Sequence, residues 1–335
     1  MSEKNFKEKI YYNAINIALN GDYRKIKSIK SNDWENSWKN IKNNFTNIDP
    51  DKEFKKLEEA KIKLILENEE DFPKELKEMP WPPFAVYILG NLKIKKAVAI
   101  VGTRKATNVG KNLARKIAKD FAEKSFSIIS GLAIGIDEAS HAGCLEICGH
   151  TVGVLPTGLK NIYPKQNQGL AQKILENGGA LLSEFPSEYH PYASSFIQRN
   201  RIISALSQAI IIIEAPEKSG ALATARFALE QNREIFVIPG PAEHPNYKGS
   251  HKLIREGARL VTNSNDIFED LGIEMEEPNP EKLSEKITSE ERIVLEAINQ
   301  TGWPASVDKI SEISKIQVQK INQIIAFLTI KGILK

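Results

Sequence analysis

Glycines and small polar residues follow several short apolar runs of this chain, and an arginine stands directly behind the first of them. Glycine lets backbone amides approach an anion, and the start of a helix adds unpaired N–H groups and the positive end of its dipole. Each glycine alone is equally well explained as a turn residue, but their agreement along one sheet edge favours phosphate binding. The set comprises Gly102, Thr103, Arg104, Ser130, Gly131, Ser219 and Gly220.

Two cations are candidates to contact the same phosphates. Arg104 follows Gly102 and Thr103, and a guanidinium fork can grip a pair of phosphate oxygens while remaining charged when partly buried. The alternative for Arg104 is a structural ion pair. Lys165, in "YPKQN", is predicted to reach this edge from another loop, and the alternative is an ordinary solvated lysine.

The stretch "FIQRNR", residues 196–201, places an aromatic ring beside two further cations on a predicted helix. Phe196 and Asn200 are four residues apart and share a face, whereas Arg199 and Arg201 cannot point the same way. One arginine is therefore expected to reach a ligand, while the other, or Asn200, ties the helix to neighbouring loops. A base can stack on Phe196 beside a phosphate-binding arginine, although a phenylalanine on such a helix is as often part of the core.

Catalytic motifs are missing from the sequence. It contains no GxSxG, HExxH or EF-hand pattern, and no GxGxxG follows the first apolar run. "GTRKATNVGK" does not fit a P-loop, because seven residues rather than four separate Gly102 from Gly110 and no Ser or Thr follows Lys111. We expect a protein that is not an enzyme and needs no cofactor.

One group of potential metal ligands needs weighing. His141, Cys144 and Cys148 recur on one face of a predicted helix, with His150 nearby. Cysteines on a buried helix face are commoner than such a site, and no second ligand cluster completes the set. We therefore expect no metal and two reduced thiols.

The elements that must position these residues alternate between short apolar runs and amphipathic helices. Strands apolar on both faces, separated by helices, predict a doubly wound, mainly parallel, Rossmann-like α/β sheet, whose ligands bind beyond the carboxyl ends of the strands. The predicted strands are 97–102, 127–131, 151–158, 179–185, 208–215, 234–240 and 259–263. The helices between them are predicted to begin near Asn108, Gly135, Gln166, Ser195, Ser219 and Ser250.

The 335 residues exceed one ordinary domain and predict a central core with smaller flanking modules. A net charge of +3 excludes a broadly basic surface, so any anion-binding surface must be local. No signal-like or membrane-spanning apolar run is present, and we expect a cytoplasmic protein. The predicted parts are a helical module (1–70), a connector (71–95), the Rossmann-like domain (96–272), an acidic linker (273–288) and a winged-helix-like module (289–335) with helices at 289–300, 306–314 and 316–331.

From about Asp71 to Gly272 the sequence resembles the bacterial DNA-processing protein A (DprA/Smf) family. The resemblance is carried by "VAIVGTR", "SGLAIGID", "PTGLKNIYPKQN", "LLSEFP", "FIQRNRIISALS", "IIIIEAPEKSGALATA", "VIPG" and "GSHKLIREGA", in the order that family shows. It implies a homodimer that binds single-stranded DNA in a positively charged pocket and loads the recombinase RecA during natural transformation. The matching pocket residues are Arg104, Lys165, Phe196, Arg199 and Arg201.

Two functional hypotheses follow. The leading one is a non-catalytic mediator that binds single-stranded DNA mainly through phosphates, with affinity that falls steeply with salt. The alternative is a nucleotide-binding sensor or a phosphoribohydrolase-like enzyme on a related fold. "KSGALATA" lacks the paired glycines of the PGGxGT signature that such hydrolases share, which counts against hydrolysis. The acidic terminal module, with 8 Lys and Arg against 10 Asp and Glu over residues 271–335, is read as a partner surface.

Overall fold

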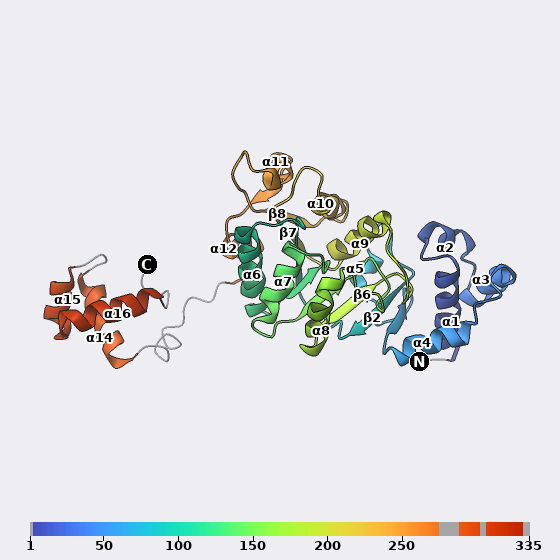
Figure 1. Cartoon of the computed structure of the whole chain (residues 1–335), viewed down its shortest axis with the longest axis horizontal. Helices are drawn as coiled ribbons and strands as arrows, with labels where there is room; N and C mark the ends of the chain where they lie inside the picture. The colour runs from blue at the N-terminus through green and yellow to red at the C-terminus, as the bar shows by residue number, and fades with distance from the viewer. Residues whose placement is uncertain (1–2, 275–287, 302–305, 331–335) are drawn as a thin grey trace. The chain divides into compact units, whose positions relative to one another are not determined.

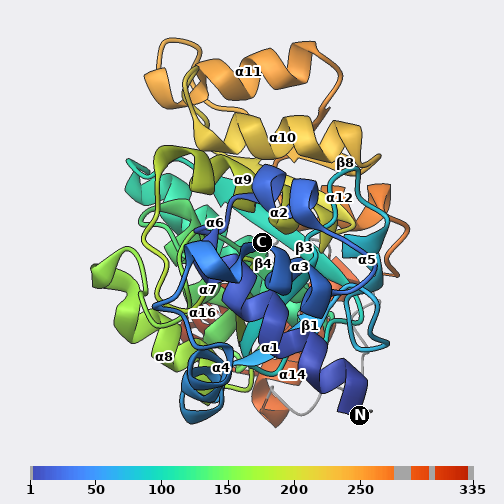
Figure 2. The same cartoon turned by 90° about the vertical axis from the view of Figure 1, so that its right-hand side faces the viewer.

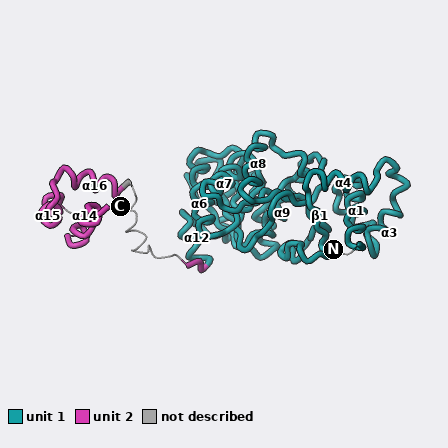
Figure 3. Tube along the Cα trace, turned by 90° about the horizontal axis from the view of Figure 1, so that it is seen from below, with its two compact units in different colours: residues 1–271 teal, residues 272–335 magenta. Residues whose placement is uncertain are grey.

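A computed structural model describes residues 3–274, 288–301 and 306–330. The chain divides into two compact units, residues 1–271 and 272–335, which are described separately (Figure 3). In the part of the chain that the structure describes, no helix is long and apolar enough to cross a membrane.

A single mixed sheet forms the centre of the first unit. Among the described residues it has nine strands in the order β1-β2-β6-β5-β4-β3-β7-β8-β9, and from β6 to β9 all neighbouring strands are parallel. The strands are β1 (Lys63–Leu66), β2 (Ala85–Gly90), β3 (Ala97–Gly102), β4 (Ser127–Ser130), β5 (Thr151–Val154), β6 (Ala180–Ser183), β7 (Ala209–Ile213), β8 (Glu234–Val237) and β9 (Arg259–Leu260). The chain moves from β3 outward to β6 and then returns to place β7 on the other side of β3. That reversal is a topological switch point, where open α/β sheets bind their ligands.

Helices cover both faces of this sheet, as the sequence predicts (Figure 1). On one face, Ile210 and Ile212 of β7 share a buried cluster with Ile203 of α9 and Ala225 of α10, because alternate residues of a strand point to opposite faces. On the other face, α6 and α7 pack together over β3 and β4, and α8 packs on β5 and β6. The helices are α5 (Lys74–Lys77), α6 (Asn108–Glu123), α7 (Ile136–Leu145), α8 (Gln168–Glu176), α9 (Ala193–Ala205), α10 (Gly220–Glu230), α11 (Lys248–Arg255) and α12 (Ser264–Asp270). The predicted doubly wound α/β fold is therefore confirmed.

Residues 3–59 form four α-helices and a short 3-10 helix (Lys42–Asn44), which lie in front of the sheet's β1–β2 side (Figure 2). Asp22, Asp33 and Asp49 cap three of these helices by accepting hydrogen bonds from first-turn amides. Aromatic side chains fill their interior, with the Tyr12 and Trp34 rings 5.0 Å apart. The helices are α1 (Glu3–Ala18), α2 (Tyr23–Ile29), α3 (Trp34–Ile41) and α4 (Pro50–Glu59).

The structure differs from the sequence-based prediction between residues 63 and 95. Strand β1 falls within the region expected to be helical, and the expected connector 71–95 contains α5 and β2. β2 is antiparallel to both β1 and β6, so both of its edges are paired, and its run "AVYI" is buried. Pro82 and Pro83, just ahead of β2, suggest an irregular segment in the sequence, but they precede the strand and leave its hydrogen bonding intact.

The second unit contains three helices in its described part: α14 (Ser289–Thr301), α15 (Val307–Ser314) and α16 (Val318–Ile330). Their apolar positions form one small core that includes Ile298, Ile310 and Ile321. The short strand that a winged helix would add falls at 331–335, outside the described residues, as do 275–287 of the predicted linker. The winged-helix assignment stays a prediction.

Candidate functional site

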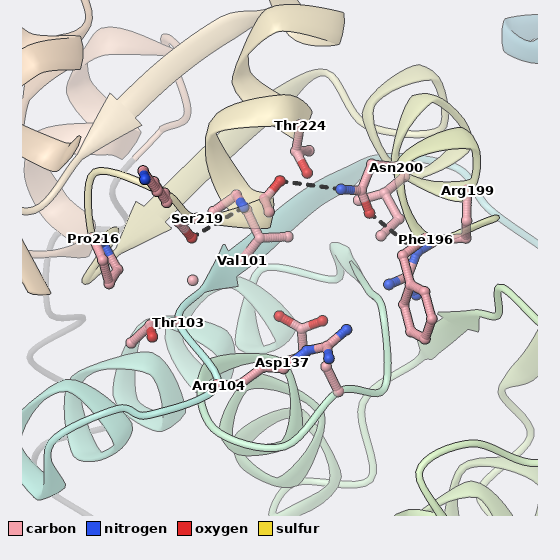
Figure 4. Close-up of a pocket in the computed structure, with 16 residues that line it drawn as sticks. Val101, Thr103, Arg104, Asp137, Phe196, Arg199, Asn200, Pro216, Ser219 and Thr224 are labelled. Atoms are coloured by element: carbon pink, nitrogen blue, oxygen red, sulfur yellow. Dashed lines mark hydrogen bonds between the residues drawn. The ribbon is translucent and has the colours of Figure 1, made fainter. Parts of the chain in front are cut away.

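A pocket of about 320 Å³ lies at the switch point, beyond the carboxyl ends of β3 and β7 (Figure 4). We call it the switch-point pocket. It brings together eight residues predicted from the sequence: Gly102, Thr103, Arg104, Phe196, Arg199, Asn200, Ser219 and Gly220. These residues come from three separate segments, the end of β3 with its loop, helix α9 and the start of α10, so the fold gathers them as the glycine pattern predicts.

The loop that carries Arg104 is tied to the end of β7 through Glu214. The backbone N–H of Thr103 donates to the Glu214 carbonyl over 2.8 Å, and the backbone N–H of Thr107 donates to its carboxylate over 2.9 Å. The Asn246 amide donates both to the Glu214 carboxylate, at 2.8 Å, and to the Lys105 carbonyl, at 2.9 Å. Both ends of the loop and its middle are therefore fixed.

Burial alone would raise the pKa of the Glu214 carboxyl, but hydrogen bonds from Thr107, Asn246 and Tyr247 hold it below its ordinary value. Glu214 has φ +53°, an uncommon conformation for a residue other than glycine. Glu214 is not among the site residues predicted from the sequence. The signal was present, because a carboxylate that directly follows the apolar run "IIII" must find partners at the strand end.

Arg104 lies at the mouth of the pocket with its guanidinium over the ring of Phe196, 4.8 Å from the centroid. Arg104 is exposed, and within the described residues no carboxylate lies at ion-pair distance from it. Phe196 is half-buried and meets the ring of Tyr163 edge-on at 5.6 Å. The alternatives of an ion-paired arginine and a core phenylalanine therefore do not describe this pair, which presents a cation and an aromatic surface together.

Arg199 lies deeper in the pocket and is 4% exposed. Its Nη1 donates to the carbonyl oxygens of Gly131, at 2.7 Å, and Val154. Burial lowers the pKa of Arg199 to about 10, with Asp137 opposing that shift, so the guanidinium stays charged at neutral pH. A Cβ at Gly131 would lie 2.4 Å from this guanidinium, which explains the glycine.

Asn200 joins two helices at the pocket wall. Its side-chain oxygen accepts a 3.2 Å hydrogen bond from Nε of Arg199, and its Nδ2 donates to the Gly220 carbonyl over 3.1 Å. Asn200 thus links α9 to the start of α10. From the sequence, either Asn200 or one of the two arginines was expected to make such a link.

Arg201 lies outside the switch-point pocket. Its Nη2 forms an ion pair with buried Glu184, and its Nη1 donates to the Trp81 carbonyl over 2.6 Å. Of the two arginines only Arg199 lines this pocket, although both are buried.

The α10 end of the pocket offers a helix N-terminus. The Ser219 hydroxyl caps the helix by accepting from the Ala221 amide over 3.2 Å, and nothing lies within 4 Å of a Cβ built on Gly220. The positive end of this helix dipole therefore opens on the pocket. Lys218, also missed by our sequence analysis, is exposed on the same rim.

Besides Arg201, three predicted residues do not line the pocket: Ser130, Gly131 and Lys165. Ser130 is fully buried and donates to the Ile100 carbonyl over 2.7 Å, so it joins β4 to β3. Lys165 is exposed, and its neighbours Tyr163, Pro164 and Gln166 line an adjoining cavity of about 230 Å³. We call this cavity the loop pocket; Arg104, Gly131, Phe196 and Arg199 line it as well.

Carboxylates near the site are accounted for within the protein. Asp137, 6% exposed, accepts a hydrogen bond from the Gly131 amide, and burial raises its pKa against the opposing charge of Arg199. At the candidate metal cluster, His141 shares a 2.7 Å hydrogen bond with Thr151, and burial lowers its pKa to about 3. Throughout the described ranges, no group of three or more His, Cys, Asp or Glu residues is arranged to hold a metal ion.

Several known proteins are similar in sequence to this chain. The chain is 41% identical over 217 residues to Protein Smf of Escherichia coli, a match that spans 64% of this chain and 58% of that protein. It is 40% identical over 216 residues to the DNA processing protein DprA of Bacillus subtilis, spanning 64% and 72% of the two chains. The match thus leaves about two fifths of the E. coli protein without a counterpart.

Solved structures agree with these relatives. DprA of Streptococcus pneumoniae superposes with a TM-score of 0.62 at 32% identity, covering 78% of this chain and 92% of that one. DprA of Helicobacter pylori gives a TM-score of 0.57 at 31% identity, covering 63% of this chain and 95% of that one. That structure is described as giving insight into the single-stranded DNA binding mode of the H. pylori protein. The model of the family called DNA recombination-mediator protein A matches residues 63–272, more than half of the sequence. This chain therefore belongs to the DNA recombination-mediator protein A family.

Proposed function

We propose that this protein binds single-stranded DNA in the switch-point pocket, without catalysing a reaction on it. One observation carries the proposal: Arg104 is exposed over the ring of Phe196 at 4.8 Å, beside the N-terminus of α10. An exposed cation and an aromatic face are the two groups that single-strand binding combines, since arginine attracts the phosphate and the ring stacks on a base. Arg199 adds a second positive charge behind them.

The relatives support the same proposal. The H. pylori protein, which shares the sheet, is described as binding single-stranded DNA. The family description, a recombination mediator, supports a further step in which this protein, as a cytoplasmic homodimer, hands the bound strand to RecA during DNA uptake. Affinity for the strand is expected to fall with salt, because phosphate contacts release counterions.

The test is binding of a fluorescent 20-residue oligothymidine, followed by anisotropy over a range of salt concentrations. Arg104→Ala should weaken binding about tenfold or more, because it removes a charge-assisted contact. Arg255→Ala is the matched control, since Arg255 is an exposed arginine on α11 and outside both pockets. It should bind like wild type. Equal affinity of Arg104→Ala and wild type at moderate salt would show that the pocket is not the binding site.

The RecA step is tested separately, by the rate at which RecA begins to hydrolyse ATP on single-stranded DNA. The wild-type protein should shorten the delay, and Arg104→Ala should not. Release of a free base from nucleoside monophosphates by the purified protein would contradict the non-catalytic proposal and favour the phosphoribohydrolase-like alternative.

A further inference from the structure

A larger cavity, of about 780 Å³, lies beyond the carboxyl end of β6, between the α1–α2 turn and the first turns of α9. We call it the aromatic groove, because its lining includes the rings of Tyr23, Trp81, Phe185, Tyr189, Tyr192 and Phe227. We propose that the aromatic groove binds the bases of the single strand that continues from the switch-point pocket. This inference rests on the proposed function and adds a second site to it.

The order of strands places three cavities along one edge of the sheet. The switch-point pocket lies at β3 and β7, the loop pocket at Gly131 after β4 and in the loop after β5, and the aromatic groove at β6. From β3 to β6 is about 14 Å at the usual spacing of neighbouring strands. A stacked strand covers that distance in about four nucleotides at 3.4 Å per base. One bound strand can therefore reach both ends of the series.

The first turn of α9 connects the cavities. Phe196 lines the switch-point pocket and the loop pocket, and the next residue, Ile197, lines the aromatic groove. Ile197 is itself exposed. A strand that leaves Phe196 over this turn meets an apolar surface and then the aromatic walls.

Two of those walls leave unusually large aromatic surfaces in contact with solvent. Trp81 is 57% exposed and Tyr192 is 61% exposed. Behind them the rings of Phe185 and Tyr189 stack at 4.4 Å with an angle of 8° between their planes. Flat exposed rings over a packed aromatic base are suited to stacking, which tolerates any base sequence.

The mouth of the groove is positively charged. Arg24, Lys25 and Lys27 on α2 are exposed along it. The carboxylate of Asp22, which also lines it, caps α2 by accepting hydrogen bonds from the Arg24 amide at 3.0 Å and the Lys25 amide at 3.2 Å. Cations beside aromatic rings distinguish this groove from an ordinary apolar cleft and favour a nucleic-acid strand over an apolar partner.

Arg201 fixes the floor of the groove. Its Nη1 bonds to the Trp81 carbonyl, and its guanidinium carbon lies 5.9 Å from the centre of the Tyr23 ring. The ion pair with Glu184 immobilises that guanidinium. Arg201 is thus a positioning residue that orients two aromatic walls, whereas Arg199 serves the switch-point pocket on the other side of α9.

The test uses oligonucleotides that keep phosphates but lose bases. Four 5′-labelled probes are compared by anisotropy: a 4-residue oligothymidine, a 20-residue oligothymidine, and two 20-residue versions in which the 16 residues beyond a 4-thymidine block are abasic at one end or the other. With wild type, both abasic versions should bind about tenfold more weakly than the full 20-residue oligothymidine, because four remaining bases cannot occupy both cavities.

Trp81→Ala should abolish that difference while leaving affinity for the 4-residue probe unchanged. The variant leaves the carbonyl that Arg201 uses, and Trp81→Leu is a second variant that keeps more apolar volume. Phe327→Ala is the matched control, because Phe327 is 58% exposed on α16 and should change neither probe. The inference fails if both abasic versions bind wild type as tightly as the full oligothymidine, or if both Trp81 variants keep the difference.

Failure of the proposed function looks different. Arg104→Ala is expected to weaken binding of the 4-residue probe, whereas Trp81→Ala is not. If Arg104→Ala binds that probe like wild type, the assignment of the switch-point pocket as a binding site is wrong, whatever the result with the abasic probes. The groove would then still be assigned as a base-binding site if the full oligothymidine binds more tightly than its abasic versions and Trp81→Ala removes that difference.

Discussion

Arg199 and Arg201 are two residues apart in α9, and their guanidinium groups serve opposite sides of that helix. Arg199 bonds to two backbone carbonyls at the ends of β4 and β5. Arg201 bonds to the Glu184 carboxylate and the Trp81 carbonyl at the end of β6. Both are buried, so exposure does not distinguish them, whereas their partners do.

The partners decide what each arginine can do for a ligand. Carbonyl oxygens satisfy the donors of Arg199 without cancelling its charge, so its positive potential extends into the switch-point pocket. Glu184 neutralises Arg201 directly, so Arg201 stabilises its surroundings and adds little field to the groove. The spacing of the two arginines along α9 makes their side chains point in different directions. Whether the partner of each guanidinium is a carbonyl or a carboxylate then decides which arginine faces a ligand and which is structural.

The largest effect that tests this comparison is expected for Arg201→Ala. It leaves the Glu184 carboxylate buried without its cation, and breaking a buried pair in this way costs about 3–5 kcal/mol of unfolding free energy. Urea denaturation followed by circular dichroism measures the change. Arg255→Ala, an exposed control, should stay within about 0.5 kcal/mol of wild type. Wild-type stability of Arg201→Ala would show that Glu184 does not depend on this pair.

Phe196→Ala tests the ligand-facing side of the same helix. Loss of one stacked base should weaken binding of the 4-residue oligothymidine by about 2 kcal/mol, roughly 30-fold. Phe196→Tyr keeps the ring and should retain most of the affinity. Ile197→Ala is the neighbouring control, because its side chain lines the aromatic groove and is expected to leave binding of the 4-residue probe unaffected. A larger loss for Ile197→Ala than for Phe196→Ala would reverse the assignment of the two sides.

Much of this site follows from sequence, and the reasons are local. A buried parallel sheet is readable from "AVAIVG" and "QAIIIIEA", and the switch-point rule then locates a pocket at the residues behind them. The helical spacing of Arg199 and Arg201 predicts two different directions.

Other features depend on contacts between distant segments. Strand β2 is specified by pairing with β1 and β6, which no local pattern reveals. The aromatic groove joins Tyr23, Trp81 and Tyr192, which are far apart in the chain. Ser130 matches the glycine-rich pattern, but its hydroxyl donates to the Ile100 carbonyl of the neighbouring strand β3, a contact that the local pattern does not reveal.

Glu214→Gln tests how the Arg104 loop is supported. The change keeps the shape but removes the charge that accepts hydrogen bonds from Thr107 and Asn246, and should cost about 1.5 kcal/mol of unfolding free energy at pH 7. Because the folded-state pKa of Glu214 lies below its ordinary value of 4.5, this contribution is complete above pH 4.5 and is lost as pH falls through the lower folded value.

The difference in unfolding free energy between wild type and Glu214→Gln should therefore be constant from about pH 7 to 5 and shrink below about 4.5. Denaturation at several pH values measures it. Glu217→Gln, an exposed glutamate a few residues along the chain, is the control and should show no comparable loss. A difference that grows on acidification would contradict the hydrogen-bonded, ionised state of Glu214.

The smallest expected effect compares the cations of the two sides. Lys218 lies on the rim of the switch-point pocket and Lys27 at the mouth of the aromatic groove, and both are exposed. Each phosphate contact contributes about 0.7 to the slope of log affinity against log salt for a single strand. Lys218→Ala should therefore lower the slope by about 0.7 with both the 4- and the 20-residue oligothymidine, whereas Lys27→Ala should lower it only with the longer one. Equal slopes for the two variants on the short probe would mean that a strand of four residues already contacts both cavities, which would place the groove closer along the strand than the spacing of β3 and β6 implies.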